Sequence, residues 1–381
     1  MTTYHWEEKQ MSSTWGNKLK LSIFGESHGE AIGVVIDNLP PGINIDMEYI
    51  KKQMSRRAPG KSNLSTKRNE SDGVKILSGT FNGISTGAPI CAIIYNEDTK
   101  SKDYSELKDN MRPGHSDYPA FVKYQGLNDY RGGGHFSGRI TAPLLFAGAL
   151  AMSILENYKG IYVASHIKSI YNIEDDKINI NDHEPACFDY LKELEFPVLS
   201  EEKGELMKAE ILKAKEEGDS LGGTVETIIT NIPPGYGQPF FDSVESRISH
   251  MIFSIPAVKG IEFGAGFNIT KMKGSHANDS YMIEDEKVSA KSNNNGGILG
   301  GITNGMPILF TTAIKPTPSI LIPQDTVNIA TMKNTVLQVK GRHDPCIVPR
   351  ALPVIEGAAA LVVLDLLMER DGELLNKKME Y

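Results

Sequence analysis

The chain has 381 residues, of which 40% are hydrophobic and 23% are charged, and its formal net charge is -8. This composition is typical of a soluble globular protein with one large or two medium domains. The acidic balance argues against a nucleic-acid-binding surface, because such surfaces usually carry a basic excess. It is compatible with a local cationic pocket that draws anions toward it.

The three cysteines, Cys91, Cys187 and Cys346, are far apart and odd in number, and the chain has no CxxC or HExxH motif. We therefore expect a reducing, cytoplasmic compartment and neither a disulfide framework nor a metal site. The N-terminus lacks the apolar segment of a signal peptide, and no apolar run is expected to reach the length of a membrane span.

The predicted elements follow from hydrophobic periodicity and β-branched content. Strands are expected at 20–24, 33–38, 74–79, 89–95, 161–169, 223–232 and 307–314, and helices at 46–54, 142–157, 205–217, 242–254 and 353–369. The helices at 142–157 and 353–369 are apolar almost all round, which predicts that they are buried. The polar segment 275–300 is expected to be one long loop.

The sequence repeats itself weakly. Residues 29–42 and 218–235 are both β-branched segments that end in Pro-Pro-Gly, and residues 83–90 are echoed in the same order by 301–308. Chance reuse of turn residues is the alternative explanation. We favour two similar α+β halves, roughly 15–160 and 215–370, around one core within a single domain, 15–370. Residues 1–14 are then an N-terminal extension and 371–381 a C-terminal tail.

Arginine is scarce and clustered. The chain has ten arginines against thirty lysines, and five of the ten lie in four short motifs rich in Gly, His, Ser or Asp. The motifs are RRAPGK at 56–61, RPGHSD at 112–117, GHFSGR at 134–139 and GRHDP at 341–345. The planar guanidinium suits bidentate binding of phosphate and carboxylate, and neighbouring glycines let a bulky anion approach the backbone. The pattern predicts a small substrate with several negative charges.

Two nucleotide-binding motifs are excluded. Gly60-Lys61-Ser62 resembles the end of a P-loop, but the first glycine of that motif is Ser55 here. The glycine run at 132–134 does not continue as GxGxxG, because Ser137 occupies the last position. Neither a P-loop nor a dinucleotide-binding Rossmann fold is therefore expected.

Candidate proton-transfer groups lie in the same motifs as the arginines. His28 in GESHG and His115 beside Arg112 are imidazoles between small residues, which suits general acid–base chemistry, although a surface histidine in a turn is the alternative. Asp344 is a candidate base or orienting group, or part of a local turn before proline. The stiff run at 315–319, KPTPS, is either a binding segment or a plain linker.

Taken together, the motifs resemble those of the chorismate synthase family over about residues 15–370. The segments that carry the resemblance are GESHG at 25–29, RRAPG at 56–60, RPGHSDY at 112–118, DYRGGG at 129–134, SIPAVKGIEFG at 254–264, NNNGGILGGITNG at 293–305, KPTPS at 315–319 and GRHDP at 341–345.

This resemblance implies an α+β fold, a β-α-β sandwich built from two similar halves with an internal pseudo-twofold repeat. It implies a carbon–oxygen lyase that converts 5-enolpyruvylshikimate 3-phosphate to chorismate and phosphate by an anti-1,4-elimination. It further implies reduced FMN as cofactor without net redox change, NADPH as a reductant or a separate flavin reductase, and a homotetramer. The substrate carries roughly four negative charges, which fits the arginine clusters.

Site residues carried over by the resemblance fall into three groups. The catalytic group is His28, His115 and Asp344. The substrate-binding group is Ser27, Arg57, Lys61, Arg68, Arg112, Ser137, Arg139 and Arg342. The flavin-binding group is His135, Phe136, Ser137, Ala257, Gly300, Lys315, Pro316, Thr317, Pro318, Ser319 and Arg342. The family often has Arg and Ser at the positions of His135 and Phe136, so the flavin-facing wall is altered here.

Two other functions stay open from the sequence. A non-catalytic protein that binds polyanions or nucleotides would need the arginines but not the two histidines and Asp344. A flavin-linked oxidoreductase would consume reductant with each product, whereas a lyase would not.

Overall fold

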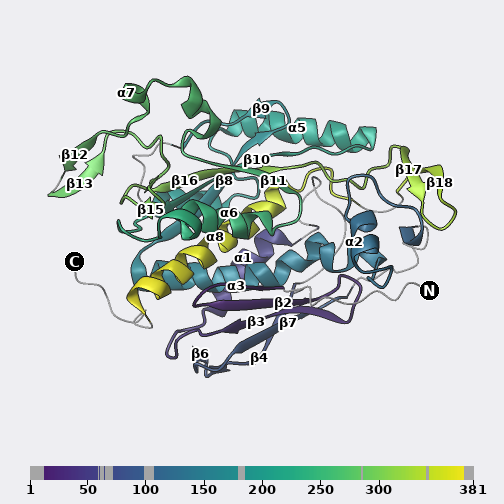
Figure 1. Ribbon diagram of the computed structural model, residues 1–381, viewed down its shortest axis with the longest axis horizontal. Coiled ribbons are helices and arrows are strands. Elements are labelled where there is room, and N and C mark those ends of the chain that lie inside the picture. The colour runs from purple at the N-terminus through teal and green to yellow at the C-terminus, as the bar shows by residue number, and fades with distance from the viewer. Residues whose placement is uncertain are drawn as a thin grey trace.

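The computed structural model describes residues 13–58, 60, 64, 72–97, 107–178, 185–284, 286–339 and 343–372. Two antiparallel five-stranded sheets dominate it (Figure 1). The first has the order β1-β2-β3-β7-β4, with β1 (Thr14–Trp15), β2 (Lys20–Gly25), β3 (Ala31–Asp37), β7 (Ile90–Tyr95) and β4 (Val74–Ser78). The second has the order β11-β16-β10-β8-β9, with β11 (Val258–Phe263), β16 (Ile308–Ile314), β10 (Gly223–Thr230), β8 (Tyr162–Ile170) and β9 (Ile173–Glu174).

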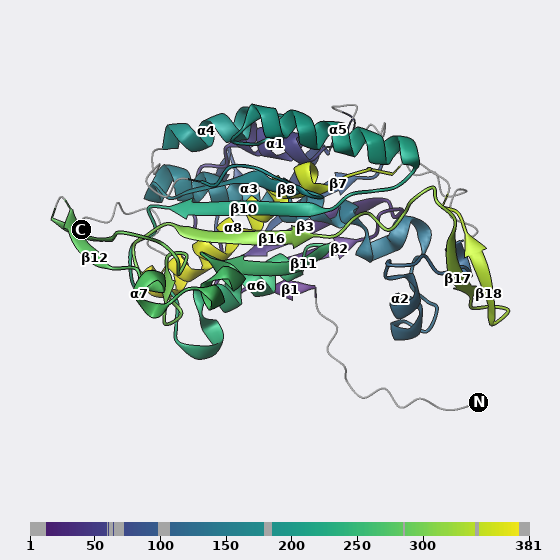
Figure 2. The same cartoon turned by 90° about the horizontal axis from the view of Figure 1, so that it is seen from above.

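Four helices fill the space between the two sheets: α1 (Met47–Arg57), α3 (Thr141–Ile154), α6 (Val244–Phe253) and α8 (Val348–Asp371) (Figure 1). Two more, α4 (Pro185–Glu193) and α5 (Glu201–Glu217), lie beside the β8 edge of the second sheet (Figure 2). The strand β10 pairs with β8 on one side and with β16 on the other, and its last six residues are buried.

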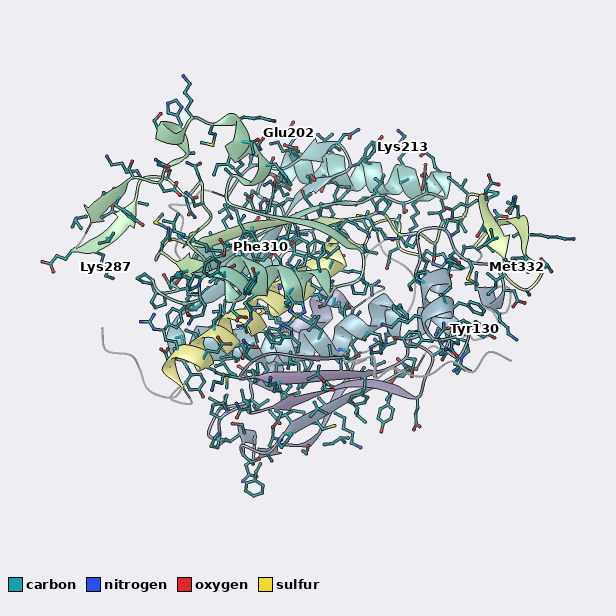
Figure 3. All side chains as sticks on the ribbon, in the orientation of Figure 1. Tyr130, Glu202, Lys213, Lys287, Phe310 and Met332 are labelled. Carbon is teal, nitrogen blue, oxygen red and sulfur yellow. The ribbon has the colours of Figure 1, made fainter. Side chains whose placement is uncertain are left out.

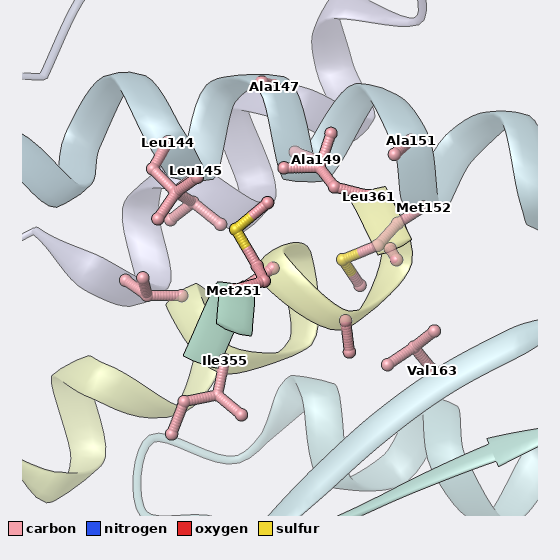
Figure 4. Close-up of a cluster of buried hydrophobic side chains, with 14 of the residues drawn as sticks. Leu144, Leu145, Ala147, Ala149, Ala151, Met152, Val163, Met251, Ile355 and Leu361 are labelled. Carbon is pink, nitrogen blue, oxygen red and sulfur yellow. The ribbon is translucent and has the colours of Figure 1, made fainter. Parts of the chain in front are cut away.

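The central helices α3 and α8 approach each other closely. A Cβ on Gly148 of α3 would lie 2.4 Å from the Cα of Gly357 in α8, so the backbones meet where both residues lack a side chain. Around this crossing, Leu145 and Met152 of α3 and Leu361 of α8 belong to the main hydrophobic core (Figure 4). All fourteen residues of α3 are buried. The predicted burial of both apolar helices is confirmed.

The predicted strands and helices are confirmed to within a few residues at most ends. The largest shift is at α8, which begins at Val348 rather than at residue 353. Pro349 is tolerated there because the first turn of a helix needs no backbone N–H donor at that position. The sequence reading missed α2 (Asp117–Lys123), α4, β9 and β11, which are short or only partly apolar.

The prediction of one long loop at 275–300 is wrong. The segment includes α7 (Gly274–Ala277), which begins one residue earlier, the hairpin of β12 (Tyr281–Glu284) with β13 (Lys287–Ala290), and β14 (Ile298–Leu299). Tyr281, Ile283 and Val288 favour extended backbone within this polar sequence. The hairpin, marked by Lys287, and a second hairpin of β17 (Gln324–Asn328) with β18 (Lys333–Leu337), marked by Met332, lie at opposite ends of the molecule (Figure 3).

The expectation that no apolar run reaches the length of a membrane span is also wrong. Among the described residues, the helical segments Gly138–Lys159 and Val348–Asp371 are long and apolar enough. In each, 94% of the apolar window is buried inside the protein. Both are core helices here, since their apolar faces are already covered by the rest of the chain.

Each sheet carries the same turn. After β3, Gly42 N donates to Ser85 O at 2.9 Å, and the Ser85 hydroxyl donates to Pro40 O at 2.7 Å. After β10, Gly235 N donates to Thr303 O at 2.8 Å, and the Thr303 hydroxyl donates to Pro233 O at 2.7 Å. Ser85 ends the hairpin of β5 (Thr80–Phe81) with β6 (Ile84–Ser85), and Thr303 ends that of β14 with β15 (Ile302–Thr303).

A buried ionic cluster lies on the side of the second sheet away from the central helices. Nδ1 of His166 lies 3.0 Å from Asp175 and its Nε2 lies 3.2 Å from Glu226, which also accepts a hydrogen bond from Lys168 at 2.8 Å. Burial lowers the pKa of His166, but the hydrogen bonds and charges of the two carboxylates outweigh it and leave the pKa raised. The folded protein therefore holds this proton at pH values where the unfolded chain has lost it.

We expect this cluster to make stability depend on pH. A raised folded-state pKa gives stabilisation that is full below the ordinary histidine value near 6.5 and declines as pH rises through the folded-state value. His166→Gln should lower the free energy of unfolding by about 3 kcal/mol at pH 6 and by less at pH 9. Urea unfolding of both proteins across this range measures the difference, with exposed His250→Gln as the control. A loss of equal size at both pH values would contradict the assignment.

Candidate active site

A run of three glycines, Gly132–Gly134, lies against both candidate histidines. The three residues have φ values of +58°, +85° and +54°, which side chains rarely permit. A Cβ on Gly132 would lie 2.2 Å from Cε1 of His28, and one on Gly133 would lie 3.1 Å from Nε2 of His115. The two histidines, which come from separate motifs, therefore face neighbouring residues of one loop. Figure 3 labels Tyr130, just before this loop.

The turn that carries His28 follows the end of β2 and is tied to the glycine loop. Ser27 N donates to Gly134 O at 3.1 Å, and the Ser27 hydroxyl oxygen lies 3.2 Å from Arg131 O. Nδ1 of His28 lies 3.0 Å from the same hydroxyl oxygen. The hydroxyl has a single hydrogen, so it can donate either to Arg131 O or to Nδ1 of His28.

Arg112 and His115 form a second cluster with Asp117 at the start of α2. Arg112 donates to Asp117 from Nε at 2.7 Å and from Nη2 at 2.8 Å. Nδ1 of His115 lies 2.6 Å from the same carboxylate. Burial raises the pKa of Asp117, but the hydrogen bonds from Arg112 and His115 outweigh it and hold the pKa far below its usual value. The carboxylate is therefore ionised.

Arg57 and Arg139 share another buried carboxylate, Asp72. Arg57, on the last turn of α1, and Arg139, just before α3, both donate to it. Arg139 also donates to the Asn96 side chain at 3.1 Å. Asn96 in turn donates to two carbonyl groups in the turn of His28. Burial raises the pKa of Asp72, but the two guanidinium charges hold it below its usual value.

Asp344 joins this arginine group through Arg350. The guanidinium of Arg350 forms an ion pair with Asp344, and its Nε donates to the carbonyl oxygen of Arg57 at 2.9 Å. Arg350 lies in the first turn of α8, so the buried helix fixes its position. The predicted catalytic aspartate and the first arginine motif therefore lie on either side of one cation.

The run Lys315–Ser319 follows β16 and contacts the motif of His115. The Lys315 ammonium donates to Gly114 O, and Nη1 of Arg112 lies 3.5 Å from the Ser319 hydroxyl. Lys315 N donates to Ala257 O at 3.0 Å, which brings Ala257 to the same place. Burial and the charge of Lys259 lower the pKa of Lys315.

One polar atom in this run lacks a partner within the chain. Among the described residues, the buried Thr317 hydroxyl makes no hydrogen bond. A buried hydroxyl without a partner is costly, so a bound molecule that supplies one would be favoured there. With the Lys315 ammonium close by in the run, this donor set fits a polar, anionic cofactor such as a flavin nucleotide.

Other predicted flavin contacts lie in different settings. His135 directs Nδ1 to Gly25 O at 2.8 Å and Nε2 to the Ser13 hydroxyl at 3.1 Å, so both ring nitrogens are used within the chain. Phe136 is partly exposed and stacks obliquely on Tyr124, with ring centroids 6.1 Å apart. The Ser137 hydroxyl accepts from Arg139 N at 3.3 Å.

Gly300 lies apart from the other predicted residues. Gly300 belongs to the turn between β14 and β15, which precedes the first residue of β16. Lys315 follows the last residue of β16, so the two lie at opposite ends of that strand. Within one chain the structure does not bring Gly300 to the glycine loop. Lys61, Arg68 and Arg342 lie outside the described residues.

The sequence reading missed three partners of the site: Asp72, Asp117 and Arg350. Asp117 stands inside the RPGHSD motif, and its spacing from Arg112 was the available signal. Asp72 and Arg350 had no local signal, since each meets its partner only through the packing of α1, α3 and α8.

Comparisons with known proteins agree on one family. A family model described as chorismate synthase matches residues 19–368. The chain is 48% identical to a chorismate synthase of Pyrococcus abyssi over 359 residues and 46% identical to one of Thermococcus kodakarensis over 358 residues. Each match covers 93% of this chain and 97% of the relative. A crystal structure of chorismate synthase superposes with a TM-score of 0.72 and 28% identity, and covers 93% of both chains.

Proposed function

Because the chain belongs to the chorismate synthase family, we propose that it converts 5-enolpyruvylshikimate 3-phosphate to chorismate and phosphate. The reaction is an anti-1,4-elimination, which removes phosphate and the C6 hydrogen in the last step of the shikimate pathway. The observation that carries this proposal is the approach of His28 and His115 to neighbouring glycines of one loop. Two imidazoles beside a backbone open to a bulky substrate suit the management of protons during an elimination.

The arginines bind the substrate's phosphate and carboxylates in this proposal. Arg112 and Arg139 are held in fixed orientations by buried carboxylates, so little ordering is required when an anion binds. Asp72 offsets one of the two charges of Arg57 and Arg139, and Asp117 offsets that of Arg112. Lys61, Arg68 and Arg342 are the further cations that the proposal requires, with Ser27 and Ser137 as hydroxyl partners.

Reduced FMN is the proposed cofactor. When bound, it supplies electron density that favours departure of the phosphate, without net redox change. The unpartnered Thr317 hydroxyl and the Lys315 ammonium support a site at Lys315–Ser319, with Ala257 beside it. His135, Phe136, Gly300 and Arg342 stay predictions as flavin contacts. Either NADPH with this chain or a separate flavin reductase would supply the reduced flavin.

The proposed architecture is one domain, residues 15–370, made of two similar halves with an internal pseudo-twofold repeat. The matching turns support it, because Gly42 and Ser85 correspond in hydrogen bonding to Gly235 and Thr303. The orders β2-β3-β7-β4 and β8-β10-β16-β11 also correspond. We further propose a cytoplasmic homotetramer, which light scattering after size-exclusion chromatography would test.

An anaerobic assay tests the proposed function. The protein is mixed with 5-enolpyruvylshikimate 3-phosphate and a catalytic amount of chemically reduced FMN, and chorismate absorbance and released phosphate are followed together. We expect equal amounts of both products, many turnovers per flavin and no consumption of reductant. A flavin-free mixture and one with oxidised FMN are the controls.

Two other outcomes would overturn the proposed reaction, and a third would overturn the proposed cofactor. Reductant consumed in proportion to product would indicate an oxidoreductase. Tight substrate binding without product would indicate a polyanion-binding protein. Equal turnover without flavin would show that the protein catalyses the elimination but does not need FMN.

A further inference from the structure

The Asp117 carboxylate has a position that its place on α2 does not explain. It is the first residue of a seven-residue helix, where an acidic side chain often caps the helix. Here the carboxylate faces the residues that precede the helix. It accepts hydrogen bonds from Arg112 N at 3.1 Å, from Nε and Nη2 of the same arginine, and from Nδ1 of His115. Its side chain is 9% exposed. The carboxylate therefore serves the two predicted active-site residues before it.

This arrangement determines which nitrogen of His115 carries a proton. An ionised carboxylate can only accept, so at 2.6 Å from it Nδ1 of His115 must be protonated. Nη2 of Arg112 lies 3.1 Å from the same Nδ1 but cannot donate to a nitrogen that already holds a hydrogen. Nη2 instead donates to Asp117. Asp117 thus keeps the arginine and the imidazole from competing for one hydrogen bond.

As a consequence, Nε2 of His115 is directed toward the glycine loop. A Cβ on Gly133 would lie 3.0 Å from Cε1 and 3.1 Å from Nε2 of His115, so this edge of the ring faces the glycine loop. Whether the ring is neutral or charged, Nδ1 keeps its hydrogen, and Nε2 is the nitrogen that gains or loses a proton. We propose that Asp117 is a positioning residue for the elimination: it holds His115 with Nε2 toward the glycine loop and orients the guanidinium of Arg112. This inference rests on the proposed function.

A double-mutant cycle tests whether Asp117 acts through His115. Asp117→Asn, which keeps the shape and removes the charge, should lower kcat by about 100-fold in the wild-type background. In the His115→Ala background the same change should cost about tenfold or less, because only its effect on the orientation of Arg112 remains. Asp175→Asn is the matched control, since it removes the carboxylate of the other buried His–Asp pair, at His166. It should lower stability and leave kcat unchanged.

An equal loss of kcat from Asp117→Asn in both backgrounds would overturn the proposal and indicate a structural role. A ¹⁵N spectrum of histidine-labelled protein gives a second readout that does not depend on turnover, with His115→Gln to assign the signals. Nδ1 of His115 should resonate as a protonated nitrogen. In Asp117→Ala, which removes the acceptor, it should move toward an unprotonated one, because Nη2 of Arg112 becomes its donor.

The two readouts separate this inference from the proposed function. If the wild-type protein shows no turnover but the ¹⁵N signals change as expected, the function fails and the positioning of His115 stands. If the signals do not differ between wild type and Asp117→Ala, the positioning role fails even in an active enzyme.

Discussion

We expect that replacing His115 with alanine lowers kcat by about two to four orders of magnitude. The imidazole lies against Gly133 with its Nδ1 fixed by Asp117, so its loss removes a proton donor or acceptor that no described neighbour replaces. Arg112 keeps its own hydrogen bonds to Asp117. The dissociation constant of the substrate should therefore change far less than kcat.

Anaerobic steady-state kinetics and isothermal titration with substrate measure the two quantities separately. His250→Ala is the control, because that histidine is exposed in the last turn of α6 and belongs to no predicted site. A His115→Ala protein that retains kcat within about threefold of wild type would contradict the catalytic role, since general acid–base groups contribute far more.

Replacing Gly132 with alanine is expected to lower kcat by about 100-fold. The new Cβ would lie 2.2 Å from Cε1 and 2.3 Å from Nδ1 of His28, and 2.7 Å from the Ser27 hydroxyl, so the imidazole must move. A displacement of about 1 Å in a catalytic group can cost about 100-fold in rate. The positive φ of Gly132 adds a stability cost of about 1–2 kcal/mol.

Gly160→Ala separates the two effects. Gly160 has a similar φ of +63°, but nothing lies within 4 Å of a Cβ added there. Both variants should lose similar stability in urea unfolding, whereas only Gly132→Ala should lose turnover. Equal kcat values in the two variants would show that the position of His28 does not limit the reaction.

Sequence patterns predicted the elements whose periodicity is set by burial. The alternation of Ile32, Val34 and Ile36 in β3 and the continuous apolar run of α3 follow directly from the surfaces that they cover. The hairpin β12–β13 was missed, because it projects from the core and its few apolar residues lie among polar ones. Composition alone therefore indicated a loop.

The sequence predicted which residues form the candidate site, but it did not predict which residues they bind to. The sequence placed His115 and Arg112 in one motif, yet it did not distinguish a guanidinium that donates to the imidazole from one that donates to Asp117. Asp72 was not a candidate, because its role depends on two arginines that are distant in sequence and converge through α1 and α3. Long-range pairing of this kind is set by helix packing, which local patterns do not encode.

In the sequence, the glycine run at 132–134 was rejected as a nucleotide motif and otherwise entered only as part of DYRGGG, one of the segments that carry the family resemblance. Its proposed role depends on positive φ and on two histidines that approach from separate motifs. Neither property can be read from the three letters alone.

A crystal structure with 5-enolpyruvylshikimate 3-phosphate and oxidised FMN bound would test the central claim most directly. We expect the substrate to lie over Gly132 and Gly133, within hydrogen-bonding reach of His28 and of Nε2 of His115, with the flavin beside Lys315–Ser319. Substrate bound elsewhere, or with His28 and His115 both beyond reach of it, would contradict the claim that the glycine loop brings the two histidines to the reaction.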